Sequence, residues 1–247
     1  MTIQLVSQPQ YKIEREGFED FIFTESSKES LIWPKAVKFA ADRNSVLQSL
    51  REAIAFRVEA NGQDDANRYQ ATRTNAAYFM KNGTAYVAFD DTPDPAKNIV
   101  IARVQEGYDA NKAGKELLIP FEDKQLKDLL IRAEKADRIK KLPNSNLELA
   151  LPDYVKNDVV RALEQDLAEP NAQFLKEKGF EKGYVWLLNP DQVGKETDGK
   201  SAIVRPVGLG GGNFGGIDDV VACYDFVDGG RARGVRGARE FSTGNKG

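Results

Sequence analysis

Glycines and arginines near the end of the chain are the residues whose type and spacing best suit binding chemistry. From Val207 to Gly237 the sequence reads VGLGGGNFGGIDDVVACYDFVDGGRARGVRG. Because glycine has no side chain, a run of it lets backbone N–H groups lie close to a ligand. Arginine forks bind phosphate oxygens without reading base sequence. The combination predicts a site for an anion, and the backbone of RNA or single-stranded DNA is the partner that we expect.

The expected binding residues are glycines and arginines in and around this loop: Arg205, Gly210, Gly212, Gly215, Arg231, Arg233, Arg236 and Arg239. Five cations and one acid lie between Gly229 and Gly247, which gives a local charge of +4. If this segment is a strand, alternation places Arg231 and Arg233 on one face. Two purely structural explanations stay open. The glycines can serve only a sharp bend or close packing, and the arginines can belong to a solvated terminal tail.

A second glycine pattern, from Gly194 to Ser201, has the G-x-x-x-x-G-K-[ST] spacing of phosphate-binding P-loops. That loop needs a helix directly after it, because the N–H groups of the helix face the phosphates. Pro206 and Gly208 leave no room for such a helix. We therefore interpret the match as accidental and expect a hairpin loop around Asp198-Gly199.

Residues 210 to 215 also fit G-x-G-x-x-G, the spacing of dinucleotide-binding turns. Such a turn opens a helix, whereas the sequence from Ile217 onward predicts a strand. Extended to Ile217, the run resembles the glycine-rich loop of protein kinases, which joins two strands. No lysine follows before Lys246, and the chain has no histidine for an HRD motif, so a kinase is excluded. What remains is a glycine loop between strands that is suited to an anion.

The lack of histidine also excludes Ser-His-Asp and Cys-His nucleophilic sites and His-ligated metal centres. Cys223 is the only cysteine, which excludes an intramolecular disulfide and a thiolate zinc cluster. We therefore expect no cofactor and no metal site, and we favour a protein that is not an enzyme. One enzymatic hypothesis stays open: Asp90, after a predicted strand, and an acid at Asp218-Asp219 would hold Mg²⁺ for phosphoester hydrolysis.

Charge and hydropathy give few further hints about partners. Lysine and arginine number 35 against 38 acids, and a net charge of −3 is too balanced to indicate a nucleic-acid or membrane partner by itself. No segment has the apolar length of a membrane span, and the first residues lack a signal-peptide pattern, so we expect a cytoplasmic protein without a membrane partner. A further hypothesis is a structural subunit of a phage particle or a homo-oligomer, in which glycine loops and terminal arms are exchanged between neighbours.

The elements that must position these residues predict an α+β fold. We expect antiparallel hairpins, several amphipathic helices and a β-rich C-terminal segment that carries the glycine-rich loop. Expected helices begin at Pro34 and at Ser45, where Gln48 completes a capping box, and cover Asp123 to Leu142 and about Asp153 to Ala168. Expected strands are a hairpin with its turn at Asn82-Gly83, Ile99 to Val104, Leu117 to Ile119, Tyr184 to Leu188, Ala202 to Val204 and Val220 to Tyr224. Pro143 to Asn146 indicates a linker between regions 1–142 and 147–247, unless the chain is one single domain.

Overall fold

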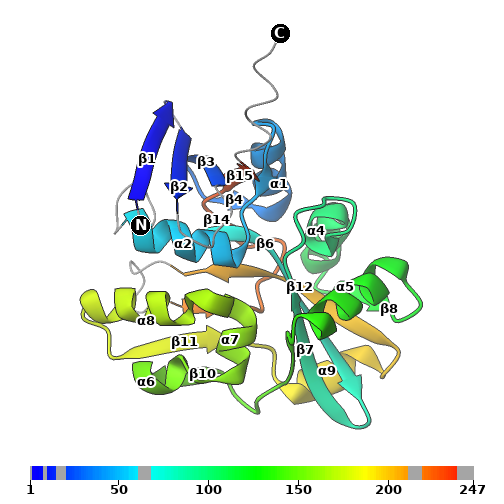
Figure 1. Ribbon diagram of the computed structural model, residues 1–247. Helices are drawn as coiled ribbons and strands as arrows, with labels where there is room; N and C mark the ends of the chain where they lie inside the picture. Colours follow the sequence, from blue (N-terminus) through cyan, green and yellow to red (C-terminus); the bar gives the residue numbers. More distant parts are fainter. Residues whose placement is uncertain (1, 8–9, 15–20, 61–67, 211–218, 238–247) are drawn as a thin grey trace.

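A computed structural model describes residues 2–7, 10–14, 21–60, 68–210 and 219–237 (Figure 1). Its main feature is a mixed sheet built from eight strands of these described residues. Seven of them follow one another across the sheet, and β8 (Leu118–Pro120) pairs with β12 outside this path. In spatial order the seven are β10 (Leu147–Ala150), β11 (Lys182–Trp186), β13 (Asp219–Val221), β12 (Ser201–Leu209), β6 (Gln70–Lys81), β7 (Thr84–Asp90) and β9 (Ile139–Lys141). Neighbours are antiparallel except β11 and β13, which are parallel.

Two smaller antiparallel sheets join the C-terminal segment to the N-terminal one. The order in the first is β1 (Thr2–Ser7), β2 (Gln10–Glu14), β3 (Phe21–Ser26), β15 (Arg233–Gly237) and β5 (Val46–Leu47). The second pairs β4 (Leu31–Ile32) with β14 (Gly229–Gly230). The segment that carries Arg231, Arg233 and Arg236 is therefore paired with strands from the first fifty residues of the chain.

Helices cover both faces of the main sheet, because its strands are apolar on both sides. Tyr78 of β6 packs in a core with Leu50 and Leu163, whereas its neighbour Phe79 packs in a second core with Leu126. Figure 1 shows α2, α7 and α8 grouped on one side of the molecule and α4 and α5 on the other. The helices are α1 (Trp33–Ala41), α2 (Leu50–Ala60), α3 (Ile99–Ala102), α4 (Val104–Lys112), α5 (Lys124–Lys135), α6 (Leu151–Tyr154), α7 (Asp158–Glu164), the 3₁₀ helix η1 (Gln165–Leu167), α8 (Ala168–Glu177) and α9 (Pro190–Thr197). Within the described segments, no helix is both long and apolar enough to cross a membrane.

The α+β class is confirmed, and so is the hairpin of β6 and β7. Its turn residues Asn82 and Gly83 have φ angles of 51° and 75°, the left-handed conformation that this pair of residues tolerates. The predicted linker at 143–146 lies between β9 and β10, at opposite edges of the main sheet. Strands from both predicted regions are thus bonded into one sheet, and the division into 1–142 and 147–247 stays a prediction.

The strand expected at Ile99 to Val104 is wrong, because this segment forms α3 and the start of α4. Asn98 caps α3 by accepting a hydrogen bond from the Ile101 N–H at 3.2 Å. Ile99 and Val100 are fully buried. Capping and burial outweigh the preference of β-branched residues for strands.

The long helix expected from Asp123 to Leu142 ends at Lys135, and a strand replaces its last turns. Asp123 caps this helix, with its Oδ1 accepting from the Gln125 N–H at 2.8 Å. Asp137 then takes a φ of 54°, which stops the helix and turns the chain into β9. Arg138 and Lys140 therefore lie on or beside an edge strand rather than at a helix end.

The capping box exists four residues later than predicted. Ser45 precedes the short strand β5, and α2 begins after Ser49. The Ser49 N–H donates to Glu52 Oε2 at 2.6 Å, and the Glu52 N–H donates to Ser49 Oγ at 3.2 Å. The motif Ser49-Leu50-Arg51-Glu52 fits the same rule as Ser45 to Gln48, so local sequence alone does not separate the two.

Two further segments differ from the predictions. No hairpin forms around Asp198-Gly199; α9 ends there, Asp198 is left-handed at φ 48°, and β12 follows. Helix followed by strand is the reverse of the P-loop order. The helix expected over Asp153 to Ala168 is divided into α6, α7 and η1, with Gln165 at a φ of 60° and a ψ of −128°.

The packing of Gly183 gives a testable consequence. A Cβ at this position of β11 would lie under 3.0 Å from the Tyr154 ring, which is buried in the core. We expect Gly183→Ala to lower the free energy of unfolding by about 1–3 kcal/mol, because the core must shift to admit a methyl group. Gly194 of α9 is the matched control, since its nearest neighbour would be Met80 Sδ at 3.9 Å. Urea denaturation of Gly194→Ala should show a gain of about 0.5–1 kcal/mol. Equal effects of the two substitutions would contradict this account.

Candidate functional site

The candidate site lies at the base of the glycine-rich segment. Strand β12 ends at Leu209, Gly210 follows, and β13 begins at Asp219. Predicted binding residues Gly212, Gly215 and Arg239 lie outside the described residues. Gly210 is buried, and its carbonyl accepts a hydrogen bond from Nη2 of Arg57, a side chain of α2 that is itself buried. The chain therefore enters the segment at a fixed point.

The structure places two of the predicted arginines in the interior. Arg205 is 6% exposed; its Nη2 lies 2.5 Å from Glu116 Oε1, and its Nη1 forms an ion pair with Asp225. Arg233 is 0% exposed, donates from Nη1 to the Thr24 carbonyl at 2.6 Å and lies over the Phe56 ring at 3.9 Å. Both guanidinium groups bond to acceptors inside the fold, so these side chains hold β12 and β15 in place.

Arg231 and Arg236 lie nearer the surface, each half-buried. The Arg231 side chain donates from Nη1 to the Ser27 carbonyl at 2.7 Å. Its backbone N–H donates to the Tyr69 carbonyl at 2.6 Å, which ties it to the strand that starts at Gln70. A fork has five N–H donors, so one contact leaves Arg231 with donors for a further oxygen.

Aromatic rings lie next to the base of the glycine-rich segment, and no pattern in the sequence marks them. The Tyr69 and Tyr224 rings meet edge to face with their centroids 5.9 Å apart, and the Trp33 ring centroid lies 5.4 Å from that of Tyr224. Both tyrosines are half-buried. A Cβ on Gly208 would meet the Tyr224 ring at under 3.0 Å, so this glycine is needed for the ring to lie flat against β12. Tyr69, Tyr224, Gly208 and Arg231 form what we call the tyrosine–arginine cluster.

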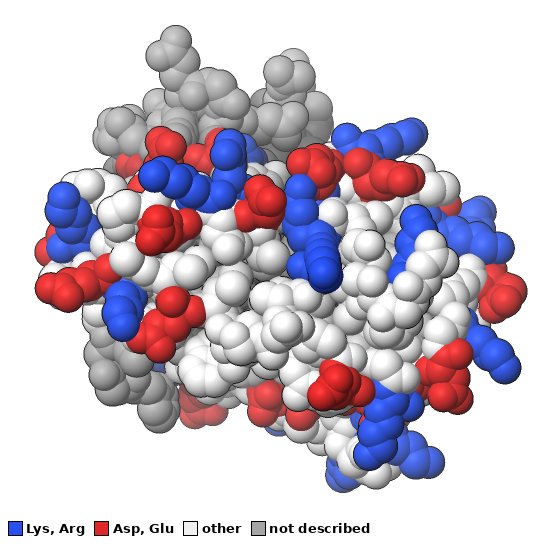
Figure 2. All heavy atoms as spheres, turned by 90° about the horizontal axis from the view of Figure 1, so that it is seen from below, with Lys and Arg blue, Asp and Glu red and all other residues white. Residues whose placement is uncertain are grey.

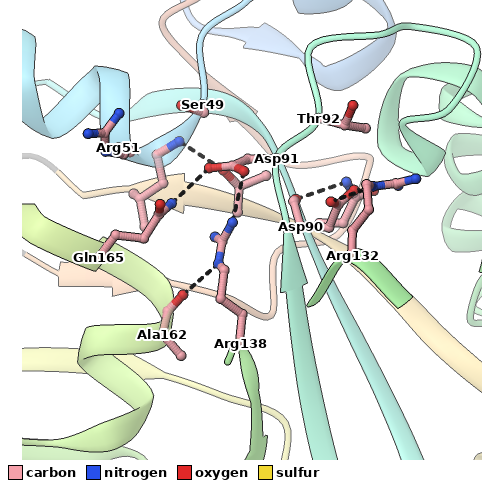
Figure 3. A network of polar contacts seen from close by, with 12 residues as sticks. Ser49, Arg51, Asp90, Asp91, Thr92, Arg132, Arg138, Ala162 and Gln165 are labelled. Atoms are coloured by element: carbon pink, nitrogen blue, oxygen red, sulfur yellow. Dashed lines mark hydrogen bonds and ion pairs between the residues drawn. The ribbon is translucent and has the colours of Figure 1, made fainter. Parts of the chain in front are cut away.

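The acidic residues considered for metal binding are engaged by arginines (Figure 3). Asp90 is 4% exposed and accepts two bonds from Arg132, at 2.9 and 2.8 Å. Asp91 accepts from Arg138 Nη1 at 2.8 Å and from Gln165 Nε2 at 3.0 Å. Across the described ranges, no three Asp, Glu, Cys or His side chains are placed to hold a metal ion. Asp218 lies outside those ranges, so the phosphoesterase hypothesis stays a prediction. Its other proposed metal ligand, Asp90, is already paired with Arg132.

The pKa of Asp91 is set by burial and by its arginine neighbours. Burial alone would raise the pKa of the carboxyl group, but the charges of Arg138 and Arg73 lower it below its usual value. Asp91 therefore stays ionised at neutral pH. Asp91 follows the last residue of β7 and binds both Arg138, which directly precedes the edge strand β9, and Gln165 of η1. It therefore links these three elements.

Surface charge elsewhere is mixed. On the face seen in Figure 2, lysines and arginines are interspersed with aspartates and glutamates around an uncharged centre. This face has no field of one sign that would attract a polyanion by itself. Contact of nucleic acid with this face would therefore rely on a local cluster of cations.

No protein-family model matches this chain, and neither a curated protein nor a solved structure is similar to it.

Proposed function

We propose that this protein is a non-enzymatic binding protein for single-stranded nucleic acid, with its contact at the base of the glycine-rich segment. The observation that carries the proposal is the tyrosine–arginine cluster. Aromatic rings that stack on bases, combined with cations that meet the backbone, are the usual means of binding a single strand without sequence preference. In this proposal the half-buried ring of Tyr69 stacks on a base, and Arg231, whose backbone N–H donates to the Tyr69 carbonyl, binds the neighbouring phosphate.

The proposal changes the roles of the residues singled out from the sequence. Arg205 and Arg233 support the fold, because their forks are bonded to Glu116 and to the Thr24 carbonyl. Arg231 and Arg236 remain the residues proposed to contact the nucleic-acid backbone. Gly210, Gly212, Gly215 and Arg239 stay predicted members of the site, as do the hypotheses of an assembly subunit and of a Mg²⁺-dependent phosphoesterase.

The test is fluorescence anisotropy with labelled oligo(dT) and oligo(U) across a salt series. We expect the wild-type affinity to fall as salt rises, since phosphate contacts release counterions. Tyr69→Ala should weaken binding about tenfold, because loss of one stacked base costs ~1–3 kcal/mol.

Tyr69→Phe is the matched control, because it keeps the ring and removes only the hydroxyl. Its affinity should equal that of the wild type. Binding that is absent or insensitive to salt would reject the proposal, and so would equal affinities of the alanine variant and the wild type.

A further inference from the structure

A polar cavity of about 530 Å³ lies between the edge strand β9 and helix α7, away from the tyrosine–arginine cluster. Its volume is in the range of small-molecule sites. The charged and amide side chains that line it are Asp137, Arg138, Lys140, Asp158, Arg161, Gln165 and Asp166. Asp158 and Arg161 lie three residues apart on one face of α7, and Gln165 and Asp166 follow in η1.

Arg138 has one nitrogen without a hydrogen-bond acceptor in the described part of the chain. The side chain is 6% exposed. Its Nε donates to the Ala162 carbonyl and its Nη1 to Asp91, both at 2.8 Å, whereas Nη2 is buried and has no such partner. Figure 3 shows the guanidinium group held between these two acceptors. Because a buried N–H without an acceptor is unfavourable, Nη2 is suited to a ligand oxygen.

Two opposite charges on α7 complete the lining. Among the described residues Lys140 pairs with Asp137 at 2.8 Å and Asp166 pairs with Arg51 at 2.7 Å. Asp158 and Arg161 are exposed and have no ion pair within those residues. The cavity therefore presents one available cation and one available carboxylate, three residues apart.

We propose that this cavity binds a small zwitterion, a molecule of amino-acid type that carries one carboxylate and one ammonium group. The carboxylate meets Arg138 Nη2 and Arg161, as guanidinium forks favour carboxylate oxygens. The ammonium group faces Asp158. A phosphate dianion fits less well, because Lys140 and Arg138 already have Asp137 and Asp91 as counterions, and the carboxylates of Asp158 and Asp166 would repel a second negative charge.

The experiment is ligand-observed NMR of the full chain with each of the twenty standard amino acids, followed by titration of those that bind. Each is compared with its deaminated analogue, which keeps the carboxylate. We expect at least one amino acid to bind saturably and about tenfold more tightly than this analogue, the effect of one charge-assisted hydrogen bond. Inorganic phosphate, the second probe, should bind more weakly than the amino acid.

Two variants test the assignment of each charge. Arg161→Ala should weaken amino-acid binding about tenfold, whereas Lys156→Ala, an exposed cation just before α7 that does not line the cavity, should leave it unchanged. Asp158→Asn should remove most of the preference over the deaminated analogue. Circular dichroism checks that each variant is folded. The proposal is overturned if no amino acid binds, if phosphate or the deaminated analogue binds as tightly, or if Arg161→Ala has no effect.

Discussion

Replacement of Glu52 by alanine should lower the free energy of unfolding by about 3–5 kcal/mol, as expected when one partner of a buried ion pair is removed. Glu52 and Arg73 are each only 4% exposed, and two contacts of 2.6 and 2.9 Å join carboxylate and guanidinium. Alanine would leave the Arg73 charge in the interior with no carboxylate at this distance. The same substitution would also remove the acceptor of the Ser49 N–H, so α2 would lose part of its N-terminal cap.

Urea denaturation followed by circular dichroism measures this loss. Glu134→Ala, on the exposed side of α5, is the control and should change stability by less than about 0.5 kcal/mol. Arg73 also donates to the Leu47 carbonyl at 2.7 Å, so it holds β5 next to α2. If Glu52→Ala were as stable as the control, the pair would contribute nothing and β5 would need another anchor.

The segments that could be predicted from sequence are those whose conformation is decided locally. Asn82-Gly83 can turn the chain by itself because both residues tolerate positive φ. Pro34 lies in the first turn of α1, where its missing N–H is harmless. The error at Ile99 to Val104 arose because Ile99 and Val100 are buried in one core with distant residues such as Leu126, and a local pattern does not show that burial.

The candidate site was predictable only in part for a similar reason. Gly208 marks a close approach, because a Cβ there would meet the Tyr224 ring, but whether an arginine faces solvent depends on partners far along the chain. Arg205 meets Glu116 across 89 residues, and Arg233 meets Thr24 across 209. Residue type suggested cations available to a ligand, whereas long-range pairing buried two of them. Tyr69 and Tyr224 are also far apart in the sequence, and no short-range spacing connects them.

The second large effect concerns Glu164, a carboxyl group that is fully buried and lies within the influence of the Arg57 charge. Burial raises its pKa from 4.5 to about 7, although hydrogen bonds from Tyr154 and Asn171 and the charge of Arg57 lower it in part. The Tyr154 hydroxyl donates to Oε1, and Asn171 Nδ2 lies 3.1 and 3.2 Å from the two oxygens. These groups belong to α6, α8 and α2, so the carboxyl group is enclosed by the elements that support the glycine-rich segment.

The raised pKa means that the folded protein binds this proton more tightly than the unfolded chain does. Stability from Glu164 is therefore full below about pH 4.5 and is lost as pH rises towards 7. Glu164→Gln mimics the neutral acid at every pH, because its amide can both accept from Tyr154 and donate to Asn171 after a half-turn of that amide. We expect the variant to equal the wild type near pH 5 and to exceed it at pH 8 by about 2–3 kcal/mol, the part of the stabilisation from the raised pKa that is lost between these two pH values.

Urea denaturation of both proteins at pH 5 and pH 8 gives this difference directly, since all other titrating groups cancel between them. Glu134→Gln should show no change in its difference from the wild type between the two pH values. A Glu164→Gln variant that is equally destabilised at both pH values would mean that the carboxylate is ionised throughout and held by Arg57. Because Arg57 also donates to the Gly210 carbonyl, a confirmed pH effect would show that proton uptake at Glu164 changes the charge next to the residue that fixes the entry to the glycine-rich segment.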